Sequence, residues 1–315
     1  TEVSMNIQQY DSFDQFLGAS EEITEAEVNF SWTIAVERRE YLKRFKQLSV
    51  LSFGPNSKIE TCAAVDEIPS LTAVWLFGQH RLRDFSALSN LPRLVELKVT
   101  AAWQLDLKPL GEMCNLEKLV LESPRKGYDV INKLEKLTDL EMSFLKIKNL
   151  KYISNLQRLR RLDVRANPLS SLDGIPQIAP IEYLDVSQTL IDSTGPLSGL
   201  SNLNVLWIRK CWKLKEIKAL ASVCGLREIY LNDNPNVLDL APLTECSNLE
   251  VLFFYGTEVT PESLRALKDM KQLKRCEFSL TRRDPPYSVQ QIQSFAPECK
   301  FRIVLPRGEI YSTPL

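Results

Sequence analysis

One apolar spacing, repeated about every 22 residues, constrains this chain more than any other feature. Residues 159–200 contain the spacing twice, with apolar side chains at the first, fourth, sixth and eleventh positions: Leu159, Leu162, Val164 and Leu169, then Ile181, Leu184, Val186 and Ile191. Such a copy has an apolar stripe that only neighbouring copies can cover. The chain is therefore predicted to be a solenoid of similar coils.

The coils can be counted by their first apolar residue. Eleven residues keep the phase: Leu48, Leu71, Leu94, Leu116, Leu137, Leu159, Ile181, Leu203, Leu226, Leu249 and Leu273. Because each coil needs only its neighbours, 315 residues can form one array rather than the two domains that this length suggests. We predict an array of about 11 coils over residues 48–300, without a hinge, followed by a cap or tail over 301–315.

Each L-x-x-L-x-L segment predicts a short strand. Its fourth and sixth residues point into the coil, so the third, fifth and seventh point to the opposite face. All strands run the same way, which predicts an α/β fold: a right-handed solenoid with a parallel sheet on the concave face and turns, 3₁₀ and short helices on the convex face. Residues 129–137 and 261–270 are the return segments most typical of true helices.

The coils resemble leucine-rich repeats of the 22-residue class, as in internalins and the regulatory subunit of protein phosphatase 1. The strongest matches are LQRLRRLDVRANPLSSLDGI and LREIYLNDNPNVLDLAPL, and the resemblance covers about Leu48 to Phe278. It implies an asparagine at the ninth position whose amide bonds to the backbone of the adjacent turn. Asn167 and Asn234 occupy this position, with Thr189, Thr257 and Thr281 as weaker substitutes and Cys211 in one coil. Pro124 and Leu145 have no donor there, which predicts irregular coils over 116–145.

The first 47 residues do not follow the repeat. Residues 27–37 alternate as a strand would, with one apolar face: Val28, Phe30, Trp32, Ile34 and Val36. Residues 38–48 then have the spacing of a short amphipathic helix. We interpret residues 1–47 as an N-terminal cap that covers the open end of the core. The alternative is a separate partner-binding domain.

Composition and motifs bound the chemistry. The 39 basic and 40 acidic residues balance, so no overall field favours a nucleic acid or a membrane as partner. The seven scattered cysteines and an N-terminus unlike a signal peptide predict a cytoplasmic protein with free thiols, although an injected effector is also compatible. His80 is the only histidine, and no phosphate-binding loop or GxSxG motif occurs. We therefore predict no enzyme activity, no cofactor and no metal.

The exposed face of four consecutive strands gathers aromatic residues, here named the aromatic strip: Tyr183, Trp207, Tyr230, Phe253 and Tyr255. Arg209 lies among them, and Asp163, Asp185 and Arg165 lie on the N-terminal side as a mainly acidic flank. Aromatic residues and arginine are typical of binding hot spots. Simple cross-strand packing of good strand formers is the alternative.

The predicted function is a non-enzymatic recognition scaffold, monomeric on its own, that binds a protein partner through the aromatic strip and the acidic flank. It would act as an adaptor, an inhibitor or a bacterial immunity protein. The alternative is the recognition domain of a host-directed bacterial effector, such as one of the ubiquitin-ligase type with its catalytic part elsewhere. The sequence leaves both open, and it does not name the partner.

Overall fold

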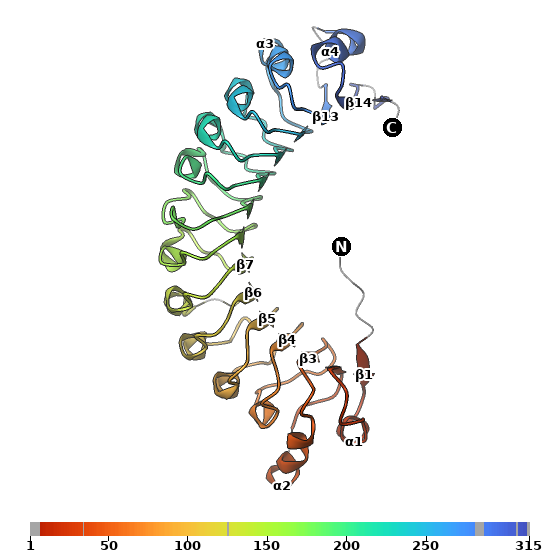
Figure 1. Ribbon diagram of the computed structural model, residues 1–315, viewed down its shortest axis with the longest axis vertical. Helices are drawn as coiled ribbons and strands as arrows, with labels where there is room; N and C mark the ends of the chain where they lie inside the picture. Colours follow the sequence, from red (N-terminus) through yellow and green to blue (C-terminus); the bar gives the residue numbers. More distant parts are fainter. Residues whose placement is uncertain (1–6, 34, 125, 281–286, 307, 314–315) are drawn as a thin grey trace. The chain divides into compact units, whose positions relative to one another are not determined.

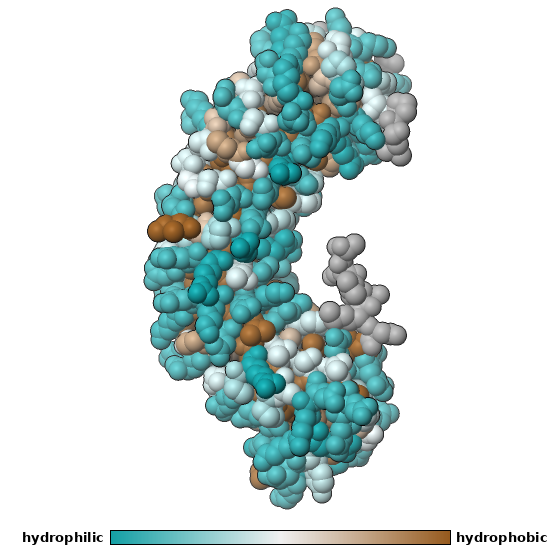
Figure 2. Space-filling model, in the orientation of Figure 1, coloured by the Kyte–Doolittle hydropathy of each residue, from teal (hydrophilic) through white to brown (hydrophobic). Residues whose placement is uncertain are grey.

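The computed structural model describes residues 7–33, 35–124, 126–280, 287–306 and 308–313. The chain forms two compact units, Thr1–Leu145 and Lys146–Leu315, which are described separately. In each unit every coil contributes a strand to a sheet and returns through a turn or a short helix (Figure 1). The visible surface is mostly hydrophilic, with small separate apolar patches (Figure 2). No helix in the described part of the chain is long and apolar enough to cross a membrane.

The first unit contains parallel strands in chain order: β1 (Gln8–Tyr10), β2 (Glu25–Val28), β3 (Val50–Phe53), β4 (Ala73–Leu76), β5 (Glu96–Val99), β6 (Lys118–Glu122) and β7 (Asp139–Ser143). Its helical segments are α1 (Phe13–Leu17), α2 (Val36–Arg39) and the 3₁₀ turns η1 (Glu40–Arg44), η2 (Val65–Glu67), η3 (Ser86–Asn90), η4 (Lys108–Glu112) and η5 (Tyr128–Lys133). Each 3₁₀ turn is short because the coil leaves few residues for the return.

The second unit continues the same plan. Its parallel strands are β8 (Arg161–Asp163), β9 (Tyr183–Asp185), β10 (Val205–Trp207), β11 (Glu228–Tyr230), β12 (Val251–Phe254), β13 (Arg275–Ser279) and β14 (Lys300–Val304). Strand β15 (Ile310–Ser312) pairs antiparallel with β14. The returns contain η6 (Lys151–Ile153), η7 (Gly195–Leu197), η8 (Lys218–Ser222), η9 (Ala241–Glu245), α3 (Pro261–Leu264), η10 (Arg265–Lys268) and α4 (Val289–Phe295).

The predicted coils match the observed strands. Each of the eleven first residues precedes a strand by two positions, from Leu48 before β3 to Leu273 before β13. Fourth-position residues pair in register, as Leu184, Leu206 and Ile229 do, and all are fully buried. Burying one such side chain contributes about 1.5–3 kcal/mol, and no single coil could do so alone. The boundaries 1–47, 48–300 and 301–315, and the absence of a hinge, remain predictions.

The ninth-position asparagines have the predicted structural role. Asn167 donates to the carbonyl of Val164 (2.9 Å). Asn234 donates to the carbonyls of Ile208 (2.6 Å) and Leu231 (2.7 Å) and accepts from the Cys211 amide (2.8 Å). These bonds tie one coil's turn to the next. Thr281 lies outside the described residues.

Two ladder residues were not recognised from the sequence. The buried side chain of Gln79 donates to the Gly54 carbonyl (2.8 Å) and accepts from the Ile59 amide (3.1 Å). The Tyr128 hydroxyl lies 2.6 Å from the Pro124 carbonyl oxygen and 2.8 Å from that of Leu145. Gln79 is the ninth residue of its own coil and takes the place of asparagine there, whereas Tyr128 supplies a donor where the ninth residues Pro124 and Leu145 have none. The irregularity expected over 116–145 is absent from strands β6 and β7, which are five residues each.

The strand predicted over 27–37 is wrong beyond Val28, where β2 ends. The chain then leaves the sheet, and Val36 starts α2 with 70% of its surface exposed. Phe30 and Trp32 produced the alternation by folding over the end of the core, where the Trp32 ring packs 5.2 Å from that of Phe53. Ile34 lies outside the described residues. Strand β1 and helix α1 were not predicted.

The return helices were predicted with mixed success. Residues 129–137 do not form an α-helix, because η5 is a 3₁₀ turn. Residues 261–270 contain the short helix α3, followed by η10. The Thr260 hydroxyl caps α3 by accepting from the Ser263 amide (3.2 Å). The coil from Leu249 to Leu273 is the longest of the array, so it has the room for an α-helical turn.

Candidate functional site

The centre of the candidate site is a continuous stack of three aromatic rings on the second unit's sheet. Register pairing places Trp207, Tyr230 and Phe253 at one level on β10, β11 and β12. The Trp207 and Tyr230 rings stack with centroids 4.0 Å apart and an interplanar angle of 19°. The Phe253 ring meets Tyr230 edge-on at 5.1 Å and 85°. All three side chains are half-buried, so each offers a fixed surface to a partner.

Arginines cover both ends of this stack. The Arg209 guanidinium carbon lies 4.5 Å from the Trp207 ring centroid, and that of Arg275 lies 5.0 Å from the Phe253 centroid. On the neighbouring strands Arg161 packs at 3.7 Å over Tyr183. Such cation–π contacts are worth about 0.5–1 kcal/mol at exposed sites. They hold the cations beside the aromatic surface.

The tyrosine hydroxyls of the strip are engaged by glutamates. Tyr230 donates to Glu228 Oε2 (2.8 Å), and Tyr255 donates to Glu277 Oε2 (3.1 Å). Burial, with help from the Glu228 hydrogen bond, raises the pKa of Tyr230 to about 12. Burial, and then the charge of Glu277, also raises the pKa of Tyr255. Both phenols are therefore neutral at physiological pH.

The carboxylates of the expected acidic flank are buried. Asp163 and Asp185 are only 1% and 2% exposed, so the expectation that they face solvent is wrong. Asp163 Oδ1 accepts from the Arg165 amide (3.0 Å), and Asp185 Oδ1 accepts from the Ser187 amide (2.8 Å). Each strand ends at its aspartate, whose side chain then satisfies the backbone of the following turn.

The exposed charges of these strands are positive. Within β8–β14, the exposed charged residues are Arg161, Arg275, Lys300 and Arg302. Glu228 is half-buried, and Glu277 is buried at 5% exposure. Arg165 joins the cations from the turn after β8, where it lies 3.3 Å from Asp163 Oδ2. The electrostatic sign of the face is thus opposite to the one expected from the sequence.

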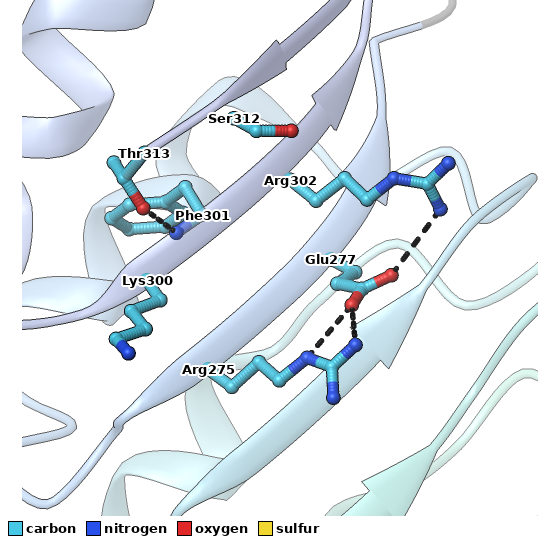
Figure 3. A pocket seen from close by; sticks show the side chains of 7 residues that line it. All are labelled: Arg275, Glu277, Lys300, Phe301, Arg302, Ser312 and Thr313. Atoms are coloured by element: carbon cyan, nitrogen blue, oxygen red, sulfur yellow. Dashed lines mark hydrogen bonds and ion pairs between the residues drawn. The ribbon is translucent and has the colours of Figure 1, made fainter. Parts of the chain in front are cut away.

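A pocket of about 340 Å³ opens at the end of this face, between β13, β14 and β15 (Figure 3). Its lining residues are Arg275, Glu277, Lys300, Phe301, Arg302, Ser312 and Thr313. Glu277 is held between two arginines, since its Oε1 accepts from Arg275 Nε (2.8 Å) and its Oε2 lies 3.7 Å from Arg302 Nη1. Lys300 is the last residue of the predicted array and Arg302 follows it, so neither belongs to one of the eleven counted strands.

The sequence thus identified some parts of the site and missed others. The structure brings Trp207, Tyr230 and Phe253 together, with Arg209 beside them, whereas Tyr183 and Tyr255 lie on the flanks. The coil pattern could have identified Arg275 and Glu277, because they occupy the third and fifth positions of their coil, which point to the same face as the aromatic strip. Among the described residues, no group of three histidine, cysteine, aspartate or glutamate side chains could hold a metal ion.

No family model matches this chain. It is similar in structure to the internalin InlF of Listeria monocytogenes, with 17% identity, a TM-score of 0.67, and coverage of 84% of this chain and 75% of that one. A leucine-rich repeat protein of Leptospira interrogans matches at 14% identity and a TM-score of 0.53, over 93% of this chain and 99% of its own. The protein has a leucine-rich repeat fold.

The functional domain of InlJ from Listeria monocytogenes adds a third likeness, with 17% identity and a TM-score of 0.58, over 84% of this chain and 59% of its own. The predicted fold class, an α/β leucine-rich repeat solenoid, is thereby confirmed. At these identities the likeness concerns the fold alone. What this leucine-rich repeat protein binds has to be argued from its own exposed side chains.

Proposed function

We propose that this leucine-rich repeat protein is a non-enzymatic scaffold that binds a protein partner on the sheet face of its second unit. The observation that carries the proposal is the stack of Trp207, Tyr230 and Phe253, in which neighbouring ring centroids lie 4.0 and 5.1 Å apart. Three large rings in register form a continuous aromatic surface, whereas a sheet face that contacts only water is stable without one. Contiguous apolar surface that stays partly exposed is typical of partner sites.

The stack is also preorganised for binding. Its rings hold one another in place, and Arg209 and Arg275 hold its two ends. Side chains that are already ordered lose little conformational entropy when a partner arrives, so more of the contact energy appears as affinity. Tryptophan, tyrosine and arginine are also the residues most enriched among hot spots. The cross-strand packing alternative accounts for the stacking but not for the cations that flank it.

The charges favour an acidic partner surface. Arg161, Arg275 and Arg302 are exposed, whereas the carboxylates of Asp163 and Asp185 are occupied by backbone amides. A partner with carboxylates around an apolar centre would match this pattern and would be steered toward it at low salt. The two aspartates would contribute indirectly, by fixing the turns that carry Arg165 and Ser187.

We place the protein among monomeric adaptors or inhibitors, such as bacterial immunity proteins, with the recognition domain of a host-directed effector as the second candidate. Both would use the same face. The cysteines are free, which fits action in a reducing compartment such as the cytoplasm. Capture from a lysate of the source organism, in parallel with capture from a host-cell lysate, separates the two roles by the origin of the retained protein.

The test of the binding face compares three variants in capture and affinity measurements. Trp207→Ala and Tyr230→Ala each remove a ring from the stack and should weaken the captured partner about 30-fold, the equivalent of about 2 kcal/mol. Trp212→Ala is the matched control, because Trp212 lies on the same coil and is 69% exposed, yet is not part of the stack. Its affinity should stay within about twofold. Equal losses in all three, or none in the first two, would overturn the proposed face.

A further inference from the structure

We infer that the pocket between β13, β14 and β15 is a carboxylate-binding site that receives an acidic side chain of the partner. This inference rests on the proposed function, because it assigns the pocket to the same partner that covers the aromatic strip. It goes further in naming a second site, its ligand chemistry and the residue that recognises it. The pocket's volume of about 340 Å³ has room for one side chain and its flanking backbone.

Register pairing concentrates the positive charge. Arg275 on β13 pairs with Lys300 on β14, and Glu277 pairs with Arg302. The four side chains therefore line one pocket, in which Arg275 and Arg302 hold the Glu277 carboxylate and Lys300 lies apart from it (Figure 3). Since neighbouring parallel strands are about 4.8 Å apart, the cations repel one another unless an anion lies between them. Glu277 supplies one such anion, and the pocket retains an excess of positive charge.

Glu277 is too occupied to recognise a ligand itself. Its Oε1 accepts from two nitrogens of Arg275, and its Oε2 accepts from Tyr255 and faces Arg302. With 5% of its surface exposed, it acts as a fixed holder of the two guanidinium groups. A cationic ligand would meet three positive side chains and no open carboxylate. An anionic ligand would meet them in a favourable arrangement.

Lys300 is the open donor of the pocket. Its ammonium makes no hydrogen bond or ion pair with any residue in the described ranges, and Figure 3 shows it directed away from Glu277. The Ser312 hydroxyl likewise has no hydrogen-bond partner within the part of the chain that the structure describes. Lys300 and Ser312 thus give the pocket two donors that the fold leaves unused, one of them charged, and the oxygens of a carboxylate can accept from donors of both kinds.

The pocket continues the aromatic strip, which favours a protein carboxylate over a free anion. Arg275 packs on Phe253 and also lines the pocket. Tyr255 belongs to the strip, and its hydroxyl accepts from Arg302 Nη1 (3.2 Å). A peptide segment lying on the rings therefore reaches the pocket without crossing other surface. Two of the Arg275 nitrogens are already bonded to Glu277, so the arginine fork that phosphate prefers is partly used.

The experiment titrates the purified chain with three probes in a calorimeter: a hexaglutamate peptide, a hexalysine peptide and inorganic phosphate. Hexaglutamate should bind the wild type, and Lys300→Glu should weaken it at least about tenfold. Lys218→Glu carries the same charge change on η8, outside the pocket, and should stay within about twofold. Hexalysine should not bind. If Lys300→Glu binds hexaglutamate as the wild type does, or if phosphate binds as tightly as the peptide, the carboxylate assignment is overturned.

Folding and the proposed function are checked separately. Lys300→Met removes the charge without reversing it, so it remains informative if Lys300→Glu lowers the melting temperature. With the captured partner, Lys300→Glu should weaken binding in addition to the effect of Trp207→Ala. If only Trp207→Ala weakens the partner, the pocket inference fails and the proposed face stands. If Lys300→Glu weakens hexaglutamate binding but Trp207→Ala does not change the affinity for the partner, the pocket stands as an acidic-peptide site and the proposed face fails.

Discussion

Tryptophans occupy the same column of the coil in both units, but their surroundings differ. In the first unit the Trp75 Nε1 donates to Glu96 (2.8 Å), and the Lys98 ammonium lies 4.1 Å from the ring centroid. Lys98 in turn pairs with Glu96 at 3.0 Å. In the second unit Trp207 instead stacks on the next strand's Tyr230. Trp75 thus lies beside a lysine and a glutamate that pair with each other, whereas Trp207 is the first ring of the aromatic stack.

The difference shows that an aromatic residue on a repeat sheet is not by itself a binding site. At Trp75 a neighbouring lysine and glutamate neutralise one another and use the indole donor. At Trp207 the neighbours are the Tyr230 ring and Arg209, and the carboxylate of Asp185, which pairs with Trp207 in the sheet, is buried. The open arrangement leaves apolar surface and positive charge for a partner. This comparison leads to four measurements.

The largest effect should come from the ladder beneath the open stack. Asn234→Ala removes the side chain that bonds to Ile208, Leu231 and Cys211, leaving buried backbone groups without partners. We expect a loss of about 3 kcal/mol in the free energy of unfolding, measured by urea denaturation. Asn236→Ala is the control, since within the described residues its exposed amide bonds only to the Trp212 carbonyl, and it should cost less than about 0.5 kcal/mol. Equal losses would show that the ladder has no special role.

The second measurement tests the two tryptophans directly. Trp207→Ala should reduce affinity for the captured partner about 30-fold, whereas Trp75→Ala should change it by less than about threefold. Both rings are half-buried and lie in the same column, so they are matched in environment apart from their neighbours. Surface plasmon resonance provides the affinities, and a thermal melt confirms folding. A larger loss at Trp75 would assign the partner to the first unit.

The third measurement concerns the phenol inside the stack. Because the pKa of Tyr230 is raised to about 12 in the folded protein, the folded state keeps this proton to a higher pH than the unfolded chain, in which a tyrosine has its ordinary pKa of about 10. The raised pKa should therefore leave stability unchanged below about pH 9 and lower it as pH rises from about 10 to 12. Urea midpoints of the wild type should fall more steeply in this window than those of Tyr230→Phe. If the urea midpoints of the two proteins fell in parallel, the pKa of Tyr230 would not be raised by folding.

The fold was largely predictable because it depends on spacing. Leucines such as Leu159 and Leu226 recur in phase, and period alone identifies the strands. The prediction was wrong where the same spacing fits both a strand and an irregular segment that covers the core. Phe30 and Trp32 alternate as strand residues do, yet they cover the end of the core. An alternating pattern reports which side chains are buried but not whether the backbone between them is extended.

The site was predictable in its rings but not in its charges. Parity alone places Trp207 and Tyr230 on one face, and register then stacks them. Parity also placed Asp163 on that face, but it could not show that the carboxylate turns back to the Arg165 amide. The charge that a face presents to solvent depends on such short-range hydrogen bonds, and the spacing of residues in the sequence does not predict them. Arg302 of the pocket lies after the last predicted coil, so the repeat spacing could not assign it to the sheet face.

The smallest effect should separate the two cations that lie over the tryptophans. Arg209 packs on Trp207, and no ion pair to it occurs within the described residues, whereas Lys98 is paired with Glu96. An uncompensated charge attracts an acidic partner from a distance, so Arg209→Gln should slow association about threefold and reduce its dependence on salt. Lys98→Gln should leave the rate unchanged, because its charge is already balanced nearby. Stopped-flow association at low and high NaCl measures both. Slower association with Lys98→Gln alone would reverse the comparison between the units.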